Sequence, residues 1–246
     1  SYSLTALTPK LLADYRDRRL CEVSVGTVRH EINLISAAFN TAIREWGMGV
    51  SNPVSLIKKP GTGKARARRI SAEEMAAIIA HSQSAELPYL LRLGATTGMR
   101  RSEMAGLTWA DIDLQKRVLV LHTSKTGEGR VVPLSSNALT VLREMPRRMD
   151  GQLFGIKPSA FSKAMKRAVC RARVAYEFDC AAKGLVPDDT FLRDIHLHDA
   201  RHEAISGLFE RGLNPMEVAS ISGHKTMTML RRYTHLQAEE LARKLA

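Results

Sequence analysis

The chain has 246 residues, of which 44% are hydrophobic and 25% are charged, as is typical of a globular protein. Its net charge of +12 favours a polyanionic partner, either nucleic acid or an acidic membrane surface, although an inert basic surface would give the same excess. No apolar run is long enough to cross a bilayer and the N-terminus does not resemble a signal peptide, so we expect a cytoplasmic protein with no membrane partner.

The three cysteines are Cys21, Cys170 and Cys180, an odd number without the spacing of metal ligands. We therefore expect reduced thiols and no metal site. The chain opens on Ser1 instead of methionine, as an expressed piece of a longer protein would.

The first 57 residues are expected to form a small helical unit. Thr8 and Pro9 are good N-cap and first-turn residues for a helix over "TPKLLADYRDRRL". Over residues 27–46, apolar positions recur every three or four residues and so share one helical face. They are Val28, Ile32, Ile35, Phe39, Ile43 and Trp46.

A basic segment, residues 58–70, is expected to link this unit to a second domain. It contains two glycines and a proline but no acidic residue, a composition typical of a flexible linker. A solvated loop is the alternative, but one-sided charge suits a chain that crosses DNA, because each neutralised phosphate releases counterions. The candidate DNA-binding residues are Lys58, Lys59, Lys64, Arg66, Arg68 and Arg69.

Residues 71–246 are expected to form the second domain. Ser71 and Glu74 have capping-box spacing, and Gly98 can end a helix over "PYLLRLGATTG". A short helix follows in "RSEMAGL". The β-branched runs "RVLVLHT" and "GRVVPL" flank a glycine-containing turn and predict an antiparallel hairpin. The pattern from Ser136 onward is mostly helical. The predicted fold class is therefore mainly α with a small antiparallel β-sheet.

Four segments of this second domain carry residues suited to phosphate chemistry. "TTGMRRSE" places an arginine at a helix start, where backbone amides and a guanidinium both favour anions. "TSKTGEGR" puts a long, mobile lysine in the hairpin turn. "LHDARHEAI" sets a histidine and an arginine on one helical face, and "SGHKTMTMLRRY" adds a histidine and a tyrosine. These residues are Arg100, Lys125, His198, Arg201, His224 and Tyr233.

Each candidate has an ordinary alternative when it is taken alone. A single surface arginine or lysine is usually a solvated charge, and Tyr233 could be a half-buried aromatic ring. His198 and His202, four residues apart, could bind a metal, but no third ligand is evident. The complete set is harder to explain by chance, and no acidic cluster accompanies it to hold magnesium.

The motifs "TTGMRRSEM", "HDARH" and "GHKTMTMLRRYTH", in this order, resemble those of the tyrosine recombinases, also called the phage integrase family. The resemblance covers residues 71–246 as a catalytic domain and residues 1–57 as a helical core-DNA-binding domain. The C-terminal stretch is most similar to shufflon-type DNA invertases and related integrases of mobile elements. One departure is Ala200, where a leucine usually stands, and it should alter packing more than chemistry.

The resemblance implies a site-specific recombinase whose nucleophile is Tyr233. A tyrosine hydroxyl with a pKa near 10 is a poor nucleophile at neutral pH, so it needs a base. By position in the motifs, His198 takes that proton and Lys125 protonates the departing 5′ oxygen. The product is a 3′-phosphotyrosine, which a 5′ hydroxyl from another strand then attacks.

The resemblance also assigns the residues that hold the phosphate. Arg100 and Arg201 are the two arginines that bind its non-bridging oxygens, and His224 adds a hydrogen bond. Glu103, three residues after the first arginine, has a supporting role. No metal or nucleotide cofactor is expected.

The implied partner is a double-stranded DNA recombination site. The implied assembly is a homotetramer in the synaptic complex, with residues 236–246 as an exchanged C-terminal helix, and a monomer in free solution. The alternatives are a type IB topoisomerase-like nicking and closing enzyme and a non-catalytic DNA-binding regulator. The sequence leaves open the DNA target, the choice between integration, excision and inversion, and the role of residues 176–194.

Overall fold

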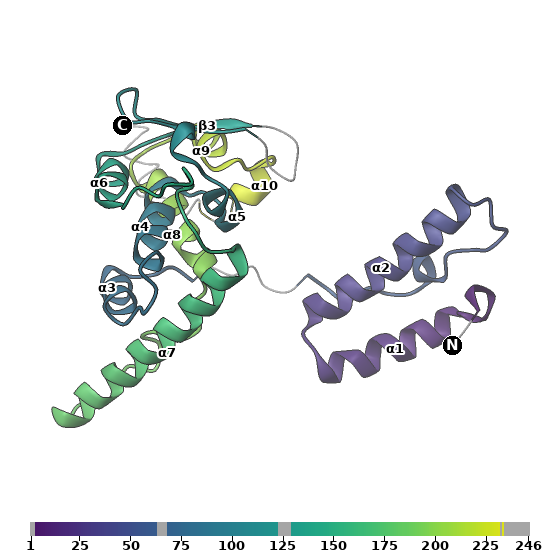
Figure 1. The fold of residues 1–246 in the computed structure, drawn as a ribbon. Coiled ribbons are helices and arrows are strands. Elements are labelled where there is room, and N and C mark those ends of the chain that lie inside the picture. Colours follow the sequence, from purple (N-terminus) through teal and green to yellow (C-terminus); the bar gives the residue numbers. More distant parts are fainter. Residues whose placement is uncertain (1–2, 63–67, 123–128, 232, 234–246) are drawn as a thin grey trace, which may run out of the picture. The chain divides into compact units, whose positions relative to one another are not determined.

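The computed structural model describes residues 3–62, 68–122, 129–231 and 233 (Figure 1). The chain divides into two compact units, an N-terminal unit, Ser1–Arg66, and a C-terminal unit, Ala67–Ala246. This division falls within the basic segment 58–70. In the part of the chain that the structure describes, no helix is both long and apolar enough to cross a membrane.

The N-terminal unit is built on two helices, α1 (Pro9–Glu22) and α2 (Val25–Arg44), with the 3-10 turns η1 (Leu4–Ala6) and η2 (Pro53–Leu56). Thr8 caps α1 by accepting a hydrogen bond from the backbone N–H of Leu11. The two helices and η2 pack around one small apolar core. Its buried residues are Leu12, Val28, Ile32 and Val54.

The predicted apolar face of α2 is confirmed at Val28, Ile32 and Phe39, which are buried. The prediction is wrong at Trp46, whose exposed fraction is 68%. The helix ends at Arg44, and Gly47 then takes a left-handed conformation with φ 61°, so Trp46 no longer continues the helical periodicity.

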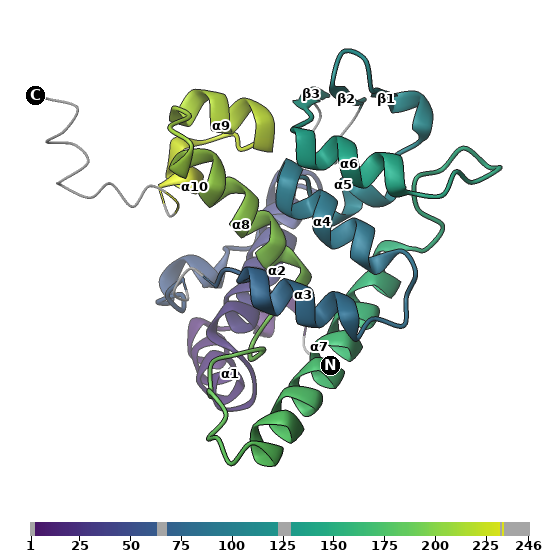
Figure 2. The ribbon, with the colours of Figure 1, turned by 90° about the vertical axis from the view of Figure 1, so that its left-hand side faces the viewer.

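Helices form most of the described part of the C-terminal unit, and the predicted fold class is confirmed. These helices are α3 (Ala72–Ala80), α4 (Leu87–Thr97), α5 (Arg101–Ala105), α6 (Ser136–Glu144), α7 (Pro158–Ala182), α8 (Leu197–Glu210), α9 (Pro215–Ser222) and α10 (Met227–Leu230). Helix α4 packs against α8 and α6, and α7 packs against α3. At the far end of α8 lie α9 and α10 (Figure 2).

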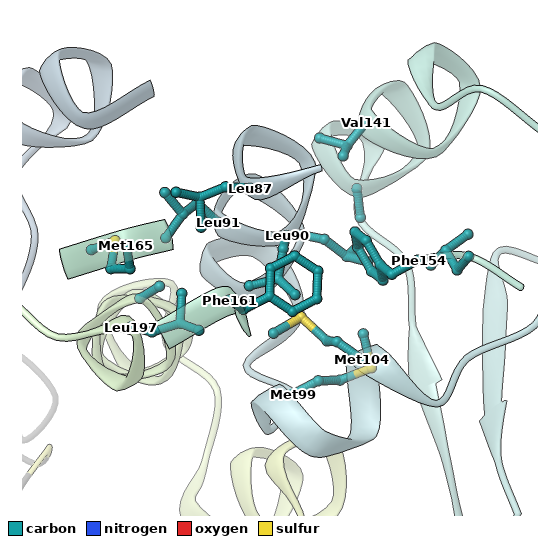
Figure 3. Packing of buried hydrophobic residues seen from close by; sticks show 14 of the residues in the cluster. Leu87, Leu90, Leu91, Met99, Met104, Val141, Phe154, Phe161, Met165 and Leu197 are labelled. Carbon is teal, nitrogen blue, oxygen red and sulfur yellow. The ribbon is translucent and has the colours of Figure 1, made fainter. Parts of the chain in front are cut away.

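The main core of the C-terminal unit lies around α4. Its leucines Leu87, Leu90 and Leu91 are fully buried and face side chains from α7, α8 and the turn after α4 (Figure 3). Phe161 of α7 packs edge-on against Phe154 with ring centroids 5.4 Å apart. This core fixes the positions of the helix ends that carry the candidate site.

A three-stranded antiparallel sheet in the order β1-β2-β3 flanks these helices. The predicted hairpin is confirmed as β2 (Val118–Leu121) and β3 (Arg130–Pro133), with Leu119 opposite Val132. The sequence did not predict β1 (Ile112–Asp113), which follows the 3-10 turn η3 (Trp109–Asp111). A strand of two residues has no alternation from which it could be predicted.

The connection over residues 176–194 is part helix and part return loop. Helix α7 runs to Ala182, and the chain then turns back toward α8. Arg173, which is buried, donates hydrogen bonds to the backbone carbonyls of Asp188 and Phe191 at 2.5 and 2.7 Å. Tyr176 accepts one from the Asp188 N–H at 3.0 Å. These contacts fix the loop against α7.

Candidate active site

The turn after α4 places Arg100 at the start of α5. Gly98 ends α4 in the left-handed region, with φ 64°, as the sequence predicted. The chain then extends, and Arg100 is the N-cap of α5. The Arg100 N–H donates to Oε2 of Glu103 at 2.8 Å, while Nη1 donates to Oε1 at 2.7 Å. Its Nη2 donates to the Gly223 carbonyl oxygen at 3.0 Å.

Helix α8 carries Arg201, whose exposed fraction is only 4%. Its Nη2 donates to the Ser222 carbonyl oxygen at 2.7 Å, and its Nη1 donates to the Gly98 carbonyl oxygen. Burial lowers the pKa of Arg201, and the positive charge of Arg100 lowers it further, to about 10. The guanidinium therefore remains charged at neutral pH and would bind an anion strongly.

The C-terminal end of α9 holds three guanidinium groups. The carbonyl oxygens of Ile221, Ser222 and Gly223 accept hydrogen bonds from Arg130, Arg201 and Arg100 respectively. A helix C-terminus carries partial negative charge, which offsets the repulsion among neighbouring cations. We call this group the arginine cluster.

Gly223 is required here for two reasons. Its φ of 69° lies in the left-handed region, which L side chains rarely adopt. A Cβ at this position would also lie 2.7 Å from Nη1 of Arg130, which is closer than real Cβ atoms come. The glycine therefore lets α9 end against the arginine cluster.

Glu103 joins two members of the arginine cluster. Besides its contacts with Arg100, its carboxylate accepts hydrogen bonds from Nη1 and Nη2 of Arg130 at 3.0 and 2.8 Å. Burial by itself raises the pKa of Glu103, but hydrogen bonds from Arg130, and then from the backbone and side chain of Arg100, outweigh it and lower the pKa to about 2. The carboxylate is therefore ionised at neutral pH.

Tyr233 lies beside the arginine cluster, with an exposed fraction of 6%. It packs with Ile205, Val218 and Leu230 in one buried apolar cluster. The ring centroid of His202 lies 5.3 Å from that of Tyr233, and the centroid of His224 lies 6.0 Å from it. The predicted nucleophile thus lies close to one of the predicted histidines.

His198 lies in the first turn of α8, before Arg201, and is exposed. Its ring stands edge-on to His202 at 5.0 Å, so His202 lies between His198 and Tyr233 in this series of rings. His198 also lines a cleft of about 720 Å³ together with Arg100 and Arg201.

In the described part of the chain no group of three or more His, Cys, Asp or Glu residues is arranged to hold a metal ion.

The structure brings together Arg100, Glu103, Arg201, His224 and Tyr233, while Lys125 lies outside the described residues. The sequence did not single out Arg130, although it stands in the quoted hairpin motif. Arg130 begins β3 and enters the arginine cluster through Glu103 and Ile221. The sequence feature that could have identified Arg130 is a charged residue at the start of an otherwise apolar strand.

The candidate DNA-binding residues of the basic segment 58–70 fall into two groups: those outside the described residues and those with hydrogen bonds in the structure. Lys64 and Arg66 lie outside the described residues. Arg68 donates to Glu74, and Arg69 donates to Glu203 at 2.8 and 2.9 Å and to Glu210. Both arginines are thus paired with carboxylates of the C-terminal unit. In the N-terminal unit, Lys59 donates to Asn33 at 3.0 Å, and the Lys58 carbonyl oxygen accepts from Arg16 at 2.7 Å. DNA binding by this segment stays a prediction.

The Phage integrase family matches the chain over residues 68–240. The shufflon-specific DNA recombinase of Escherichia coli is 38% identical over 99% of this chain, which spans 62% of that relative's length. Among solved structures, the Tn1549 transposon integrase in complex with circular intermediate DNA has a TM-score of 0.71 at 19% identity, covering 100% of this chain and 87% of that one. A lambda integrase dimer bound to a core site has a TM-score of 0.72 at 22% identity, covering 97% and 83%. The two structures share the fold of this chain.

Proposed function

Because the chain belongs to the phage integrase family, we propose that it is a site-specific DNA recombinase that cleaves and rejoins strands through a 3′-phosphotyrosyl intermediate. The observation that carries this proposal is the arginine cluster beside Tyr233. Arg100, Arg201 and His224 come from three separate segments, yet all three contact the last turn of α9 or the residue after it. This arrangement supports a site for one phosphate next to a tyrosine.

In the proposed reaction, the phenol oxygen of Tyr233 attacks the scissile phosphorus and the bond to the 5′ oxygen breaks. His198 accepts the phenol proton, and Lys125 donates a proton to the departing 5′ oxygen. A phosphodiester has no good leaving group, so this general acid contributes a typical factor of about 10²–10⁴ in rate. Reversal of these steps, with a 5′ hydroxyl from another strand, rejoins the DNA.

The guanidinium groups of Arg100 and Arg201 would hold the non-bridging oxygens as charge develops on the five-coordinate phosphorus. Preorganised donors of this kind typically contribute about 3–4 kcal/mol each. Glu103 and the α9 carbonyls already orient these donors, so little reorganisation is required. The arginines therefore stabilise the transition state more than they stabilise the ground state.

The proposed substrate is a double-stranded recombination site, and the proposed product is DNA in which strands have exchanged partners. The two similar structures are an integrase in complex with circular intermediate DNA and an integrase dimer bound to a core site. A solved lambda integrase tetramer is bound to a Holliday junction, which supports a homotetramer for this chain during exchange. We place the protein with the DNA of a bacterial or phage genome, in the cytoplasm.

A nicked suicide substrate tests the proposal. Loss of a short 5′ fragment after cleavage prevents rejoining and traps a covalent adduct that survives SDS. Wild-type protein should form this adduct, while Tyr233→Phe should bind DNA equally well without forming it. Tyr176→Phe is a matched control, because Tyr176 lies on the return loop and should retain full adduct formation. An SDS-stable adduct with Tyr233→Phe would refute the assignment of the nucleophile.

A type IB topoisomerase-like activity shares this cleavage chemistry, so adduct formation does not distinguish the two. The distinguishing measurement is product formation from plasmids that carry one or two recognition sites. A recombinase requires two sites for product, whereas a nicking and closing enzyme relaxes a plasmid with one. A recombinant product from two sites only would support the present proposal.

A further inference from the structure

Ser222 and His224 form a buried polar pair next to the arginine cluster. Ser222 is the last residue of α9, with an exposed fraction of 0%. Its Oγ lies 2.6 Å from the carbonyl oxygen of Val218 and 2.6 Å from Nδ1 of His224. The oxygen–oxygen separation lies within the usual O–H···O range of about 2.5–3.0 Å, and the nitrogen–oxygen separation is slightly shorter than the usual N–H···O range of about 2.7–3.2 Å, so both atoms of each pair share a proton.

These two contacts determine which atom carries each proton. A serine hydroxyl has one proton and can accept through its lone pairs, whereas a carbonyl oxygen can only accept. The single hydroxyl proton of Ser222 therefore lies on the line to Val218. Nδ1 of His224 must then donate to Ser222 Oγ, because the hydroxyl has no second proton to give. The imidazole is thus protonated at Nδ1.

The other ring nitrogen provides an independent observation. Nε2 of His224 lies 3.4 Å from Nη2 of Arg201. A guanidinium has no acceptor, so this contact is favourable only when Nε2 carries a lone pair. In a neutral imidazole with its proton on Nδ1, Nε2 is that acceptor. The contacts at the two ends of the ring agree on the same tautomer.

We propose that Ser222 is a positioning residue that holds His224 as the neutral Nδ1–H tautomer and so presents Nε2 to Arg201 as an acceptor. This inference rests on the proposed function, and it refines the role of His224. The neutral ring cannot donate to a phosphate oxygen through Nε2. It orients Arg201 instead, and it becomes a phosphate donor only after Nε2 takes up a proton.

The charged groups around His224 connect this protonation to DNA binding. Arg201 of α8 and Arg100 at the start of α5 face the site. Arg130 of β3 donates to the Ile221 carbonyl oxygen and to the carboxylate of Glu103, and Tyr233 lies after α10. Glu103 offsets one of the three arginine charges, and the positive charge that remains opposes a further proton on the ring. A bound phosphate supplies negative charge and favours that proton. Protonation would also end the Nε2 contact with Arg201 and free its Nη2 for the phosphate.

Nitrogen-15 NMR of the free protein tests the tautomer without any recombination assay. The chain has eight histidines, so the His224 resonances are assigned as those lost in His224→Asn. We expect the neutral ring to carry its proton on Nδ1 in the wild type and in Ser222→Thr, which keeps the hydroxyl. In Ser222→Ala the ring should shift toward the Nε2–H form. Ser206→Ala, at a buried serine of α8, should leave the ratio unchanged.

A wild-type ring protonated at Nε2 would overturn the proposal, as would a wild-type ratio in Ser222→Ala. If Ser222→Ala does not fold, the wild-type and Ser222→Thr spectra still decide the tautomer. Because these spectra are recorded without DNA, a failure of the recombinase proposal would appear separately, as a wild-type protein that forms no adduct.

Cleavage kinetics test the consequence for phosphate binding. The substrate carries a 5′-bridging sulfur, which leaves without a proton and so removes the contribution of Lys125. If only the protonated His224 donates, the wild-type rate should fall by about tenfold per pH unit once the pH exceeds the pKa of the ring in the complex with DNA. Ser222→Ala can present Nε2–H in the neutral ring, so its alkaline decline should be several-fold shallower. Superimposable pH profiles would contradict the inference.

Discussion

Glu103→Gln should lower the free energy of unfolding of the C-terminal unit by about 3 kcal/mol at neutral pH. The carboxylate accepts two hydrogen bonds from Arg130 and two from Arg100. Its pKa is about 2 in the folded protein, against 4.5 for the unperturbed group. The difference of about 2.5 units, at about 1.4 kcal/mol per unit, gives the expected contribution. The amide keeps the shape of the side chain but loses its charge.

The same shift sets the pH dependence of this effect. A carboxyl group whose folded-state pKa is lowered stabilises the fold above its unfolded value, and this contribution disappears as the pH falls through the folded-state value. The contribution of Glu103 is therefore complete well above pH 4.5 and is lost between there and about pH 2. The difference between wild type and Glu103→Gln should shrink from about 3 kcal/mol at pH 7 to about 1 kcal/mol at pH 3.

Urea titrations at the two pH values measure this difference. Glu73→Gln is the matched control, since Glu73 is an exposed carboxylate that makes no ion pair with the described residues. The pKa of Glu73 is also lowered, by a backbone hydrogen bond and by the hydroxyl of Ser71, so the control should show a loss of the same sign that is much smaller than that of Glu103→Gln at pH 7. An equal loss at pH 7 and pH 3 for Glu103→Gln would mean that the damage comes from packing and would refute the electrostatic reasoning.

Three further outcomes are expected. Lys125→Ala should cleave ordinary DNA very slowly but cleave a strand with a 5′-bridging sulfur at nearly the wild-type rate. Arg100→Ala should show no such rescue. If the sulfur does not rescue Lys125→Ala while DNA binding is intact, the lysine is not the general acid. Neutralising Lys64 and Arg66 should weaken binding to all DNAs alike and reduce the salt slope by about 0.9 per phosphate contact, as read from binding titrations. Neutralising Arg68 and Arg69 should change the salt dependence of DNA affinity less, because both arginines pair with carboxylates. Equal salt slopes for the two double variants would contradict this difference between the two pairs of residues. Deleting residues 237–246 should spare binding to a single site but prevent synapsis, and a normal tetramer in native gels would refute a role for the tail in assembly.

The local features of the fold were predictable because short-range chemistry determines them. The Ser71–Glu74 capping box forms with both of its hydrogen bonds, at 3.2 and 3.1 Å. Gly98 ends α4 in the left-handed conformation that favours glycine. The hairpin forms because two β-branched runs flank a glycine-containing turn. The prediction at Trp46 was wrong because helical periodicity alone does not indicate where a helix ends.

The site was predictable only in part. The order of the motifs identified residue types that suit a phosphate, and the structure brings Arg100, Arg201, His224 and Tyr233 to one end of α9. The pairing of Arg69 with Glu203 was not predictable, since these residues are far apart in the sequence and each is ordinary by itself. The same holds for the Arg130–Glu103 pair.

Backbone carbonyl oxygens, as well as side chains, hold the guanidinium groups of the arginine cluster in place. Three guanidinium groups and one carboxylate, Glu103, leave an excess of two positive charges before DNA binds. Carbonyl oxygens of residues 221–223 hold these groups without cancelling their charge, because a carbonyl contributes a dipole and no net charge. The excess is thus retained for a phosphate. The contact between Arg201 and His224, at 3.4 Å, is longer than the hydrogen bonds from Arg201 to the carbonyl oxygens of Gly98 and Ser222, so we expect a phosphate oxygen to displace this contact first.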